Sequence, residues 1–238
     1  MNSTRDHFVL ALTALLLLTV PLHANVLLPG STVSPDIFPD VGSVPLLDQT
    51  SGTFSFGSGP GLITGSYVEE VAVDPLGITC SGCLDFGYQI SLDPLLSAGI
   101  FNVSMGSYFG FSIDVGYIER TGFNPCCTGD GDPFLVSRGP FGGVITFKFA
   151  TPSGGEPIGP GGQSAFLVVG TDATTYDSLG SMGIAGGRAD SPAQGQINGL
   201  FEPTSPAPVP EPSTLALLGL GVAGIAVSFR KRSARIRA

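Results

Sequence analysis

The sequence contains no tryptophan and only two histidines, His7 and His23, both close to its N-terminus. Histidine is the commonest general base and a frequent metal ligand, so the remaining chain cannot build a Ser-His-Asp or Cys-His catalytic site. The chain also lacks the Gly-x-Ser-x-Gly motif of a nucleophile elbow and the motif of a phosphate-binding loop. These absences predict a protein that is not an enzyme, with no catalytic residues and no cofactor.

One carboxylate pair remains to be considered, because a glycosidase needs only two acids beside the bond that it cleaves. Glu69 and Glu70 are adjacent in the sequence, so in a strand their side chains point to opposite faces. We therefore expect one of them in solvent and the other at a turn or an edge.

Basic residues are scarce between the two ends of the chain. Of the 10 Lys and Arg residues, only Arg120, Arg138, Lys148 and Arg188 lie between residues 25 and 208, against about 17 acids. Phosphate backbones are held mainly by Lys and Arg, so the composition excludes a nucleic-acid partner. A region this acidic stays soluble and attracts cations.

The N-terminus has the three parts of a secretory signal peptide. Arg5 precedes the apolar run Phe8–Val20, and Ala24 supplies the small residue before a cleavage site. This pattern predicts a signal peptide over residues 1–24, cut between Ala24 and Asn25, and therefore an exported protein.

The C-terminus has a different three-part pattern: the motif Val209-Pro210-Glu211-Pro212, an apolar run over residues 213–229, and a basic tail over residues 230–238 that begins Arg230-Lys231-Arg232. A helix of about 16 residues spans roughly 24 Å, slightly short of the bilayer core of about 30 Å, and flanking basic side chains can snorkel to compensate. The pattern predicts a transmembrane helix over 213–229. By the positive-inside rule, Arg230, Lys231 and Arg232 stop the segment at the cytoplasmic side.

This C-terminal pattern resembles the PEP-CTERM sorting signal of Gram-negative bacteria. The resemblance implies an exosortase as the processing partner, a precursor anchored in the inner membrane, and delivery to the cell surface or the extracellular matrix. Residues 84–94 and 163–176 also resemble segments of exported PEP-CTERM proteins, most of which are uncharacterised surface or matrix proteins.

Glycine and proline, 35 and 20 residues, separate short apolar segments throughout the central region. In residues 109–117 every odd position is large and apolar, the period-two pattern of a half-buried strand. Such strands, with turns between them and no convincing helix, predict an all-β fold: one β-sandwich of jelly-roll-like type over residues 25–202. A stiff proline-rich spacer that ends in the Pro-Glu-Pro motif is expected over residues 203–212. The expected strands are Thr53–Phe56, Leu62–Val73, Leu84–Leu92, Gly99–Met105, Tyr108–Ile118, Phe134–Ser137, Val144–Ala150 and Ala165–Val169.

Four cysteines lie in the exported region, as Cys80 and Cys83 and as the neighbours Cys126 and Cys127. An even number in an oxidising compartment predicts disulfides, with three possible connectivities. We favour cross-links between the two pairs, because pairing within each pair closes small, strained rings. A zinc site and a thioredoxin-like site are less compatible with the pattern, since adjacent cysteines rarely share one tetrahedral site and no βαβ context is present.

One metal hypothesis comes from the sequence Thr-Gly-Asp-Gly-Asp-Pro. It places Asp130 and Asp132 two residues apart in a glycine loop, a pattern that suits the oxygen preference of calcium. The downstream bidentate Glu of a full calcium loop is absent, and a plain acidic turn is the alternative.

Two function classes fit these observations. The first is a non-enzymatic protein of the cell surface or exopolysaccharide matrix. The second is a β-sandwich module that binds carbohydrate or another surface, including ice, since the PEP-CTERM signal occurs on some ice-binding proteins. Trp, a favoured stacking surface for sugars, is absent, and tyrosines exposed on one face could substitute for it, whereas a polar surface favours the structural role. The tyrosines are Tyr67, Tyr88, Tyr108, Tyr117 and Tyr176.

Overall fold

The computed structural model describes residues 26–38, 46–74, 79–95, 97–118, 131–151 and 154–206, all within one compact unit that ends at Pro206. These residues form fourteen strands and one short 3-10 turn, η1 (Gly59–Gly61), and contain no α-helix. The prediction of an all-β fold is therefore confirmed.

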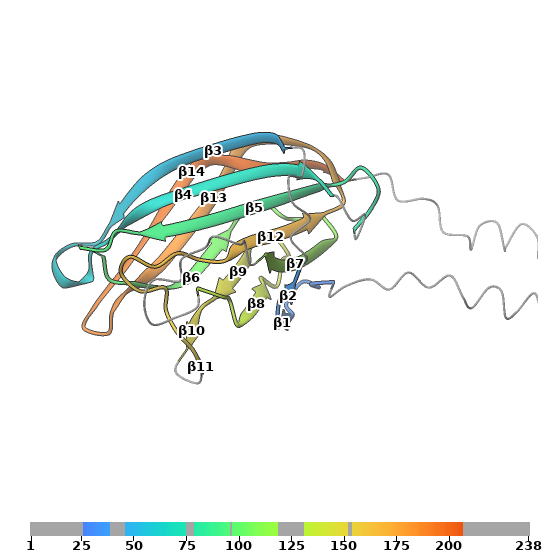
Figure 1. Cartoon of the computed structure of the whole chain (residues 1–238). Helices are drawn as coiled ribbons and strands as arrows, with labels where there is room; N and C mark the ends of the chain where they lie inside the picture. Colours follow the sequence, from blue (N-terminus) through green and yellow to red (C-terminus); the bar gives the residue numbers. More distant parts are fainter. Residues whose placement is uncertain are drawn as a thin grey trace, which may run out of the picture. The chain divides into compact units, whose positions relative to one another are not determined.

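Twelve of the strands build two six-stranded sheets. Figure 1 shows β3, β4 and β5 in one layer and β6, β8 and β9 in the other. The first sheet has the order β1 (Thr32–Val33), β8 (Leu135–Arg138), β9 (Ile145–Lys148), β6 (Gly99–Met105), β13 (Ala173–Arg188), β14 (Ser191–Pro206). The second sheet has the order β2 (Asp36–Ile37), β7 (Ile113–Ile118), β12 (Phe166–Thr171), β5 (Leu84–Leu92), β4 (Ile63–Val73), β3 (Leu46–Phe56). A separate small ribbon pairs β10 (Ala150–Thr151) with β11 (Gly154–Gly155).

A single hydrophobic core takes side chains from both sheets, which makes the fold sandwich-like. In β5 the alternation is regular: Phe86, Tyr88 and Ile90 are buried in the core, while the residues between them face the other side. In β9 the core side chains are Ile145 and Phe147, and Lys148 is half-buried on the outer face, as the alternation predicts.

The strand expected over residues 108–118 begins only at Ile113. Residues before it form a loop in which Gly110 has a φ of 88°, a conformation that favours glycine. Phe109, which the alternation placed on a buried face, is 73% exposed. The alternating pattern continues through the loop, so periodicity alone did not locate the start of the strand.

The longest hairpin, β13–β14, was not among the expected strands. It is rich in glycine and small polar residues, and its buried apolar side chains, such as Met182, Ile184 and Leu200, are widely spaced. Strand β14 continues through Pro206, four residues into the segment expected to be a spacer. Pro203 and Pro206 lie in β14, an edge strand, which is where sheets accept proline because only one side of the strand carries a ladder.

Arg138, only 5% exposed, joins three loops at one end of the sandwich. Its guanidinium donates to the carbonyl oxygens of Leu27, Tyr108, Phe111 and Gly142 at 2.8–3.0 Å. Burial lowers the pKa of Arg138, and Asp172 opposes that shift. A buried charge is costly unless it is hydrogen-bonded. The four carbonyl oxygens therefore stabilise the buried guanidinium, and the guanidinium supplies their hydrogen-bond donors.

Candidate functional site

The residues of the two targeting signals lie outside the described residues: Ala24, Asn25, the motif Val209–Pro212, the expected membrane helix over 213–229, and Arg230, Lys231 and Arg232. In the part of the chain that the structure describes, no helix is long and apolar enough to cross a membrane.

The disulfide in the structure joins Cys80 to Cys83 and is not the cross-link that we favoured between the two pairs. Gly82, with a φ of 82°, turns the chain, and Cys83 N donates to the carbonyl oxygen of Cys80 at 3.2 Å. The turn brings the two Cα atoms to 5.3 Å, a usual separation for a disulfide. Cys126 and Cys127 lie outside the described residues.

The calcium hypothesis at Asp130 and Asp132 falls at the edge of the described region. Asp132 is half-buried just before β8, and Asp130 lies outside the described residues. Over the ranges that are described, no three Asp, Glu, His or Cys side chains gather as a metal site.

The expectation for Glu69 and Glu70 is wrong. Their side chains do point to opposite faces, but neither is in solvent: Glu69 is fully buried and Glu70 is 8% exposed. Glu69 points into the core opposite Tyr88 and accepts a hydrogen bond from Phe201 N at 2.8 Å, while its Oε1 has no hydrogen-bond partner. Burial raises the pKa of Glu69 to about 7, against the lowering effects of Phe201 N–H and Tyr88.

A buried pair of tyrosines adjoins Glu69. The hydroxyls of Tyr88 and Tyr108 are 2.7 Å apart, and burial raises the pKa of each well above its ordinary value. Tyr88 and Tyr108 are therefore neutral polar groups of the core. All three side chains of this network lie in the hydrophobic core.

The tyrosine platform that a sugar-binding face would use is absent from the described residues. Tyr88, Tyr108 and Tyr117 are buried, and Tyr67 and Tyr176 are half-buried. The exposed aromatic rings are phenylalanines instead: Phe109 is 73% and Phe141 is 84% exposed.

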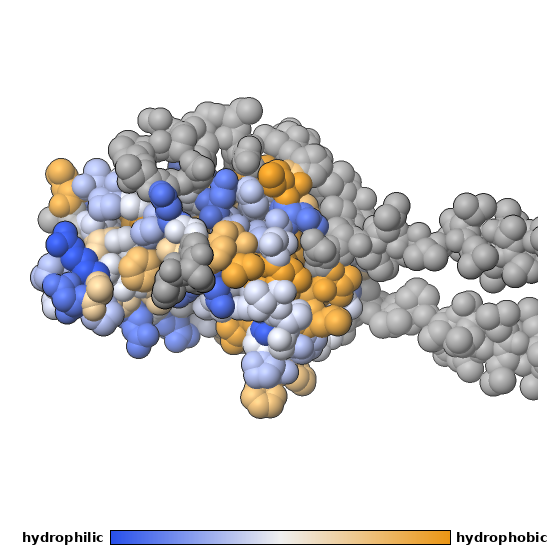
Figure 2. Space-filling view, turned by 90° about the horizontal axis from the view of Figure 1, so that it is seen from below, coloured by the Kyte–Doolittle hydropathy of each residue, from blue (hydrophilic) through white to orange (hydrophobic). Residues whose placement is uncertain are grey.

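Phe109 and Phe141 stand on neighbouring loops at the end of the sandwich that Arg138 organises. Tyr108 N donates to Gly143 O at 3.0 Å, and a Cβ on Gly143 would lie 3.8 Å from Phe109 Cβ. Figure 2 shows hydrophobic residues gathered toward one end of the face that it displays. This surface is therefore not uniformly polar.

The outer face of the first sheet carries neutral hydroxyl and amide groups. One row of paired residues crosses all six strands without a charge: Thr32, Ser137, Thr146, Ser104, Gly183, Gln196. Because strands lie about 4.8 Å apart, neutral polar side chains recur along the row at regular spacing, interrupted by Gly183. Ser104 and Thr146 hydrogen-bond to each other across it at 2.9 Å.

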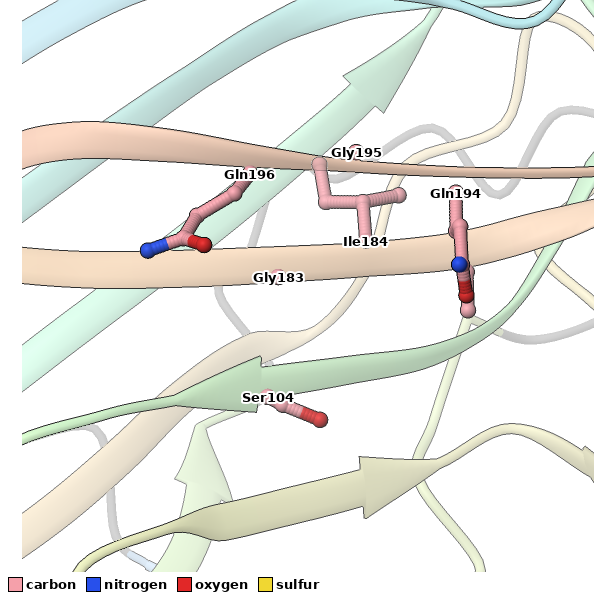
Figure 3. A pocket seen from close by; sticks show the side chains of 7 residues that line it. Ser104, Gly183, Ile184, Gln194, Gly195 and Gln196 are labelled. Atoms are coloured by element: carbon pink, nitrogen blue, oxygen red, sulfur yellow. The ribbon is translucent and has the colours of Figure 1, made fainter.

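An open groove of about 430 Å³ lies where this row meets the β13–β14 hairpin. Figure 3 shows Gln194 and Gln196 extending from β14 over β13, with Ser104 on the neighbouring strand β6. Gly183 leaves space at its centre, because an added Cβ would meet nothing closer than 3.9 Å. The groove offers amide and hydroxyl groups and no titratable side chain.

A second polar niche lies on the outer face of the second sheet, at β5, β12 and β7. Asp85 and Asp114 are the cross-strand neighbours of Gly170 on its two sides. Burial raises the pKa of Asp85 to about 8, with further contributions from Asp74 and Asp114. Burial raises the pKa of Asp114 to about 6, against a hydrogen bond from Val115 N, and Asp36 and Asp74 add to the rise.

Sequence reasoning missed this niche because its residues are scattered over five segments. A signal was nonetheless present, since the strands of the second sheet contain acids and no Lys or Arg. Only the strand order shows that Asp85 and Asp114 flank the same glycine.

Comparison with family models identifies residues 208–232 as a PEP-CTERM protein-sorting motif. The match confirms the resemblance drawn from the Pro-Glu-Pro motif, the apolar run and the basic tail. It covers the C-terminal signal and not the β-domain. Neither curated proteins nor solved structures gave a significant match.

Proposed function

We propose that this chain, an exported protein with a PEP-CTERM sorting motif that an exosortase processes, is a non-enzymatic component of the cell surface or the exopolysaccharide matrix. The motif at residues 208–232 carries the proposal, because it marks an exported precursor for sorting by an exosortase. The outer face of the first sheet supports it, since a neutral array of hydroxyl and amide groups suits contact with hydrated polymers.

In this proposal the precursor is held in the inner membrane by residues 213–229 and keeps Arg230, Lys231 and Arg232 on the cytoplasmic side. The exosortase then cuts near Pro210–Pro212. The β-domain leaves with a short remnant of the motif and enters the matrix or the cell surface.

The intact mass of the protein, measured separately in membranes and in matrix from its natural host, tests this function. We expect a matrix species that begins near Asn25 and ends near Pro210–Pro212. A sole membrane species that retains residues 230–238 would overturn the matrix role, because the tail would then act only as an anchor.

A variant with Pro210, Glu211 and Pro212 all replaced by Ala should accumulate uncut in the membrane fraction. Its matched control is Pro206→Ala, which also removes a proline but lies in β14, before the motif. Normal processing of the triple variant would show that the motif is not what the exosortase reads.

A second candidate function is binding of neutral carbohydrate, and the exposed rings of Phe109 and Phe141 favour it. Aromatic faces stack on the apolar faces of sugars, and rings held by a rigid scaffold bind at a lower entropic cost. Arg138 supplies that rigidity by holding both loops.

Co-sedimentation with the matrix polysaccharide of the host tests this second function. Phe109→Ala and Phe141→Ala should each weaken binding by about tenfold, because each removes one aromatic contact with the sugar. The control is Leu179→Ala, which removes a side chain that is 76% exposed elsewhere. Equal binding by all three variants would exclude the phenylalanines as a sugar platform.

A further inference from the structure

The second sheet has an unbalanced charge. Its six strands contain six acids and no Lys or Arg; the acids are Asp36, Asp48, Glu69, Glu70, Asp85 and Asp114. Two of them, Asp85 and Asp114, flank Gly170 of the central strand β12 on the outer face, because each is its partner in a neighbouring strand. Figure 1 shows β5, β12 and β7 side by side.

Gly170 leaves a niche between these two carboxylates. The point that a Cβ would occupy lies 3.0 Å from Thr79 Oγ1, 3.2 Å from Asp85 Oδ1 and 3.7 Å from Asp114 Cβ. Oxygens of Thr79 and Asp85 therefore border the point above Gly170, and Asp114 approaches it from the other side with its Cβ. Asp74 stands at the rim, where its Oδ2 accepts a hydrogen bond from Thr79 N at 3.0 Å.

Two side-chain oxygens of the residues around Gly170 are buried and have no hydrogen-bond partner. Asp114 is only 4% exposed; its Oδ1 accepts from Val115 N at 2.9 Å, but its Oδ2 has no partner. Thr79 Oγ1 is likewise buried without one. Buried carboxylate oxygens that lack a donor are costly, and a bound cation removes that cost.

We propose that the outer face of the second sheet binds a calcium ion between Asp85 and Asp114, above Gly170, with Thr79 Oγ1 as a neutral ligand. Calcium suits the niche because it takes only oxygen ligands, tolerates irregular geometry and completes its shell with water. Two carboxylates and a hydroxyl make a weak site of the extracellular class, with a dissociation constant of about 0.1–1 mM. This site is separate from the loop of Asp130 and Asp132.

The disulfide supports the same niche. Cys80 directly follows Thr79, and the Cys80–Cys83 bond closes the turn that leads from Thr79 into β5. Asp74 N also donates to Cys83 O at 2.8 Å. The oxidised turn thus holds Thr79 and Asp74 beside Asp85.

The test is thermal unfolding of the full chain in mild detergent after removal of metal by chelation. Addition of 5 mM CaCl₂, a concentration of about ten dissociation constants, should raise the unfolding midpoint by about 3–5 °C. Magnesium and sodium chloride at matched ionic strength should raise it by less than about 1 °C. A rise that is the same with all three salts would show ionic screening and overturn the proposal.

Substitutions locate the ion. Asp85→Asn and Asp114→Asn should each abolish most of the calcium-dependent rise, whereas Asp190→Asn, the same change at an exposed turn residue, should keep it. Gly170→Ala retains every carboxylate but places a methyl group in the niche, so it should also lose the rise. Native mass spectrometry of the same samples should show one calcium in the wild type and none in these three niche variants.

Two results would contradict the location. If Asp132→Asn abolishes the calcium response while Asp85→Asn keeps it, the ion binds the glycine loop instead. If Gly170→Ala and both niche Asn variants respond like the wild type, calcium does not enter the niche.

Discussion

The carboxylate of Glu69 accepts a hydrogen bond from the backbone N–H of Phe201, 132 residues further along the chain, at 2.8 Å. The bond ties β4 of one sheet to β14 at the edge of the other. Phe201 has no partner in the register of β13 and β14, which shifts between Asp177 and Gly180. Glu69 therefore satisfies a backbone donor that the irregular hairpin releases.

Glu69 should make the protein less stable as the pH rises. Burial raises its pKa to about 7 from an ordinary 4.5, so the folded state holds the proton more tightly than the unfolded state. Its contribution to the free energy of unfolding is complete below about pH 4.5 and is lost as the pH rises through 7. Glu69→Gln should be more stable than wild type at pH 8 by about 2–3 kcal/mol, and should differ little at pH 4.5.

Urea unfolding at both pH values measures this difference, with Glu156→Gln as the control at an exposed acid. Asp85 and Asp114, whose pKa values are also raised, keep some pH dependence in the variant. An equal effect of Glu69→Gln at both pH values would mean that Glu69 does not titrate in this range.

Arg138 should be the least replaceable basic residue of the domain. Arg138→Met leaves four carbonyl oxygens without their donor and should lower the free energy of unfolding by about 2–4 kcal/mol. Arg138→Lys should recover only part of the loss, because an ammonium lacks the planar fork of donors. Arg188→Met, at an exposed position, is the control for loss of charge. Denaturant unfolding measures these free energies. A decrease of less than about 1 kcal/mol for Arg138→Met would contradict the stabilising role of Arg138.

Two glycines of the β13–β14 hairpin should respond differently to alanine. A Cβ on Gly195 would collide with the ring of Phe56, so Gly195→Ala should cost about 1–3 kcal/mol of stability. A Cβ on Gly183 meets only ordinary contacts at 3.9 Å, so Gly183→Ala should change stability by less than about 0.5 kcal/mol. Thermal unfolding of the pair tests this contrast, and similar losses at both positions would refute it.

The disulfide should be found within the first cysteine pair. Non-reducing peptide mapping of the exported protein should recover Cys80 and Cys83 in one linked peptide. Because the bond closes a loop of only four residues, Cys83→Ser should cost about 2 kcal/mol. Peptides that link either of these cysteines to Cys126 or Cys127 would contradict this prediction and support the cross-links between the two pairs.

Much of the β-fold was predictable because its strands alternate regularly. Leu84–Leu92 and Gly99–Met105 have the predicted bounds. In Leu84–Leu92 the apolar residues recur at every second position. The β13–β14 hairpin was not predictable in this way. Glycines and small residues fill it, and its burial comes from the opposite sheet, which the local pattern does not contain.

Some residues of the candidate sites were likewise predictable from the sequence, and others were not. The sorting motif is contiguous, so its residues could be read directly from the chain. The burial of Glu69 and the placing of Asp85 and Asp114 on either side of Gly170 could not, because they depend on which strands are neighbours. The disulfide expectation failed because ring strain was judged without the turn at Gly82, which brings Cys80 and Cys83 into bonding range.

The amino-acid sequence by itself determined the sorting motif, the acidity of the exported region and the all-β class, because each depends on composition or on neighbours along the chain. Only the tertiary structure decided which acids are buried, which loops Arg138 joins and which carboxylates flank Gly170. Those features depend on strand order and on the packing of two sheets, which bring together residues that local patterning leaves far apart.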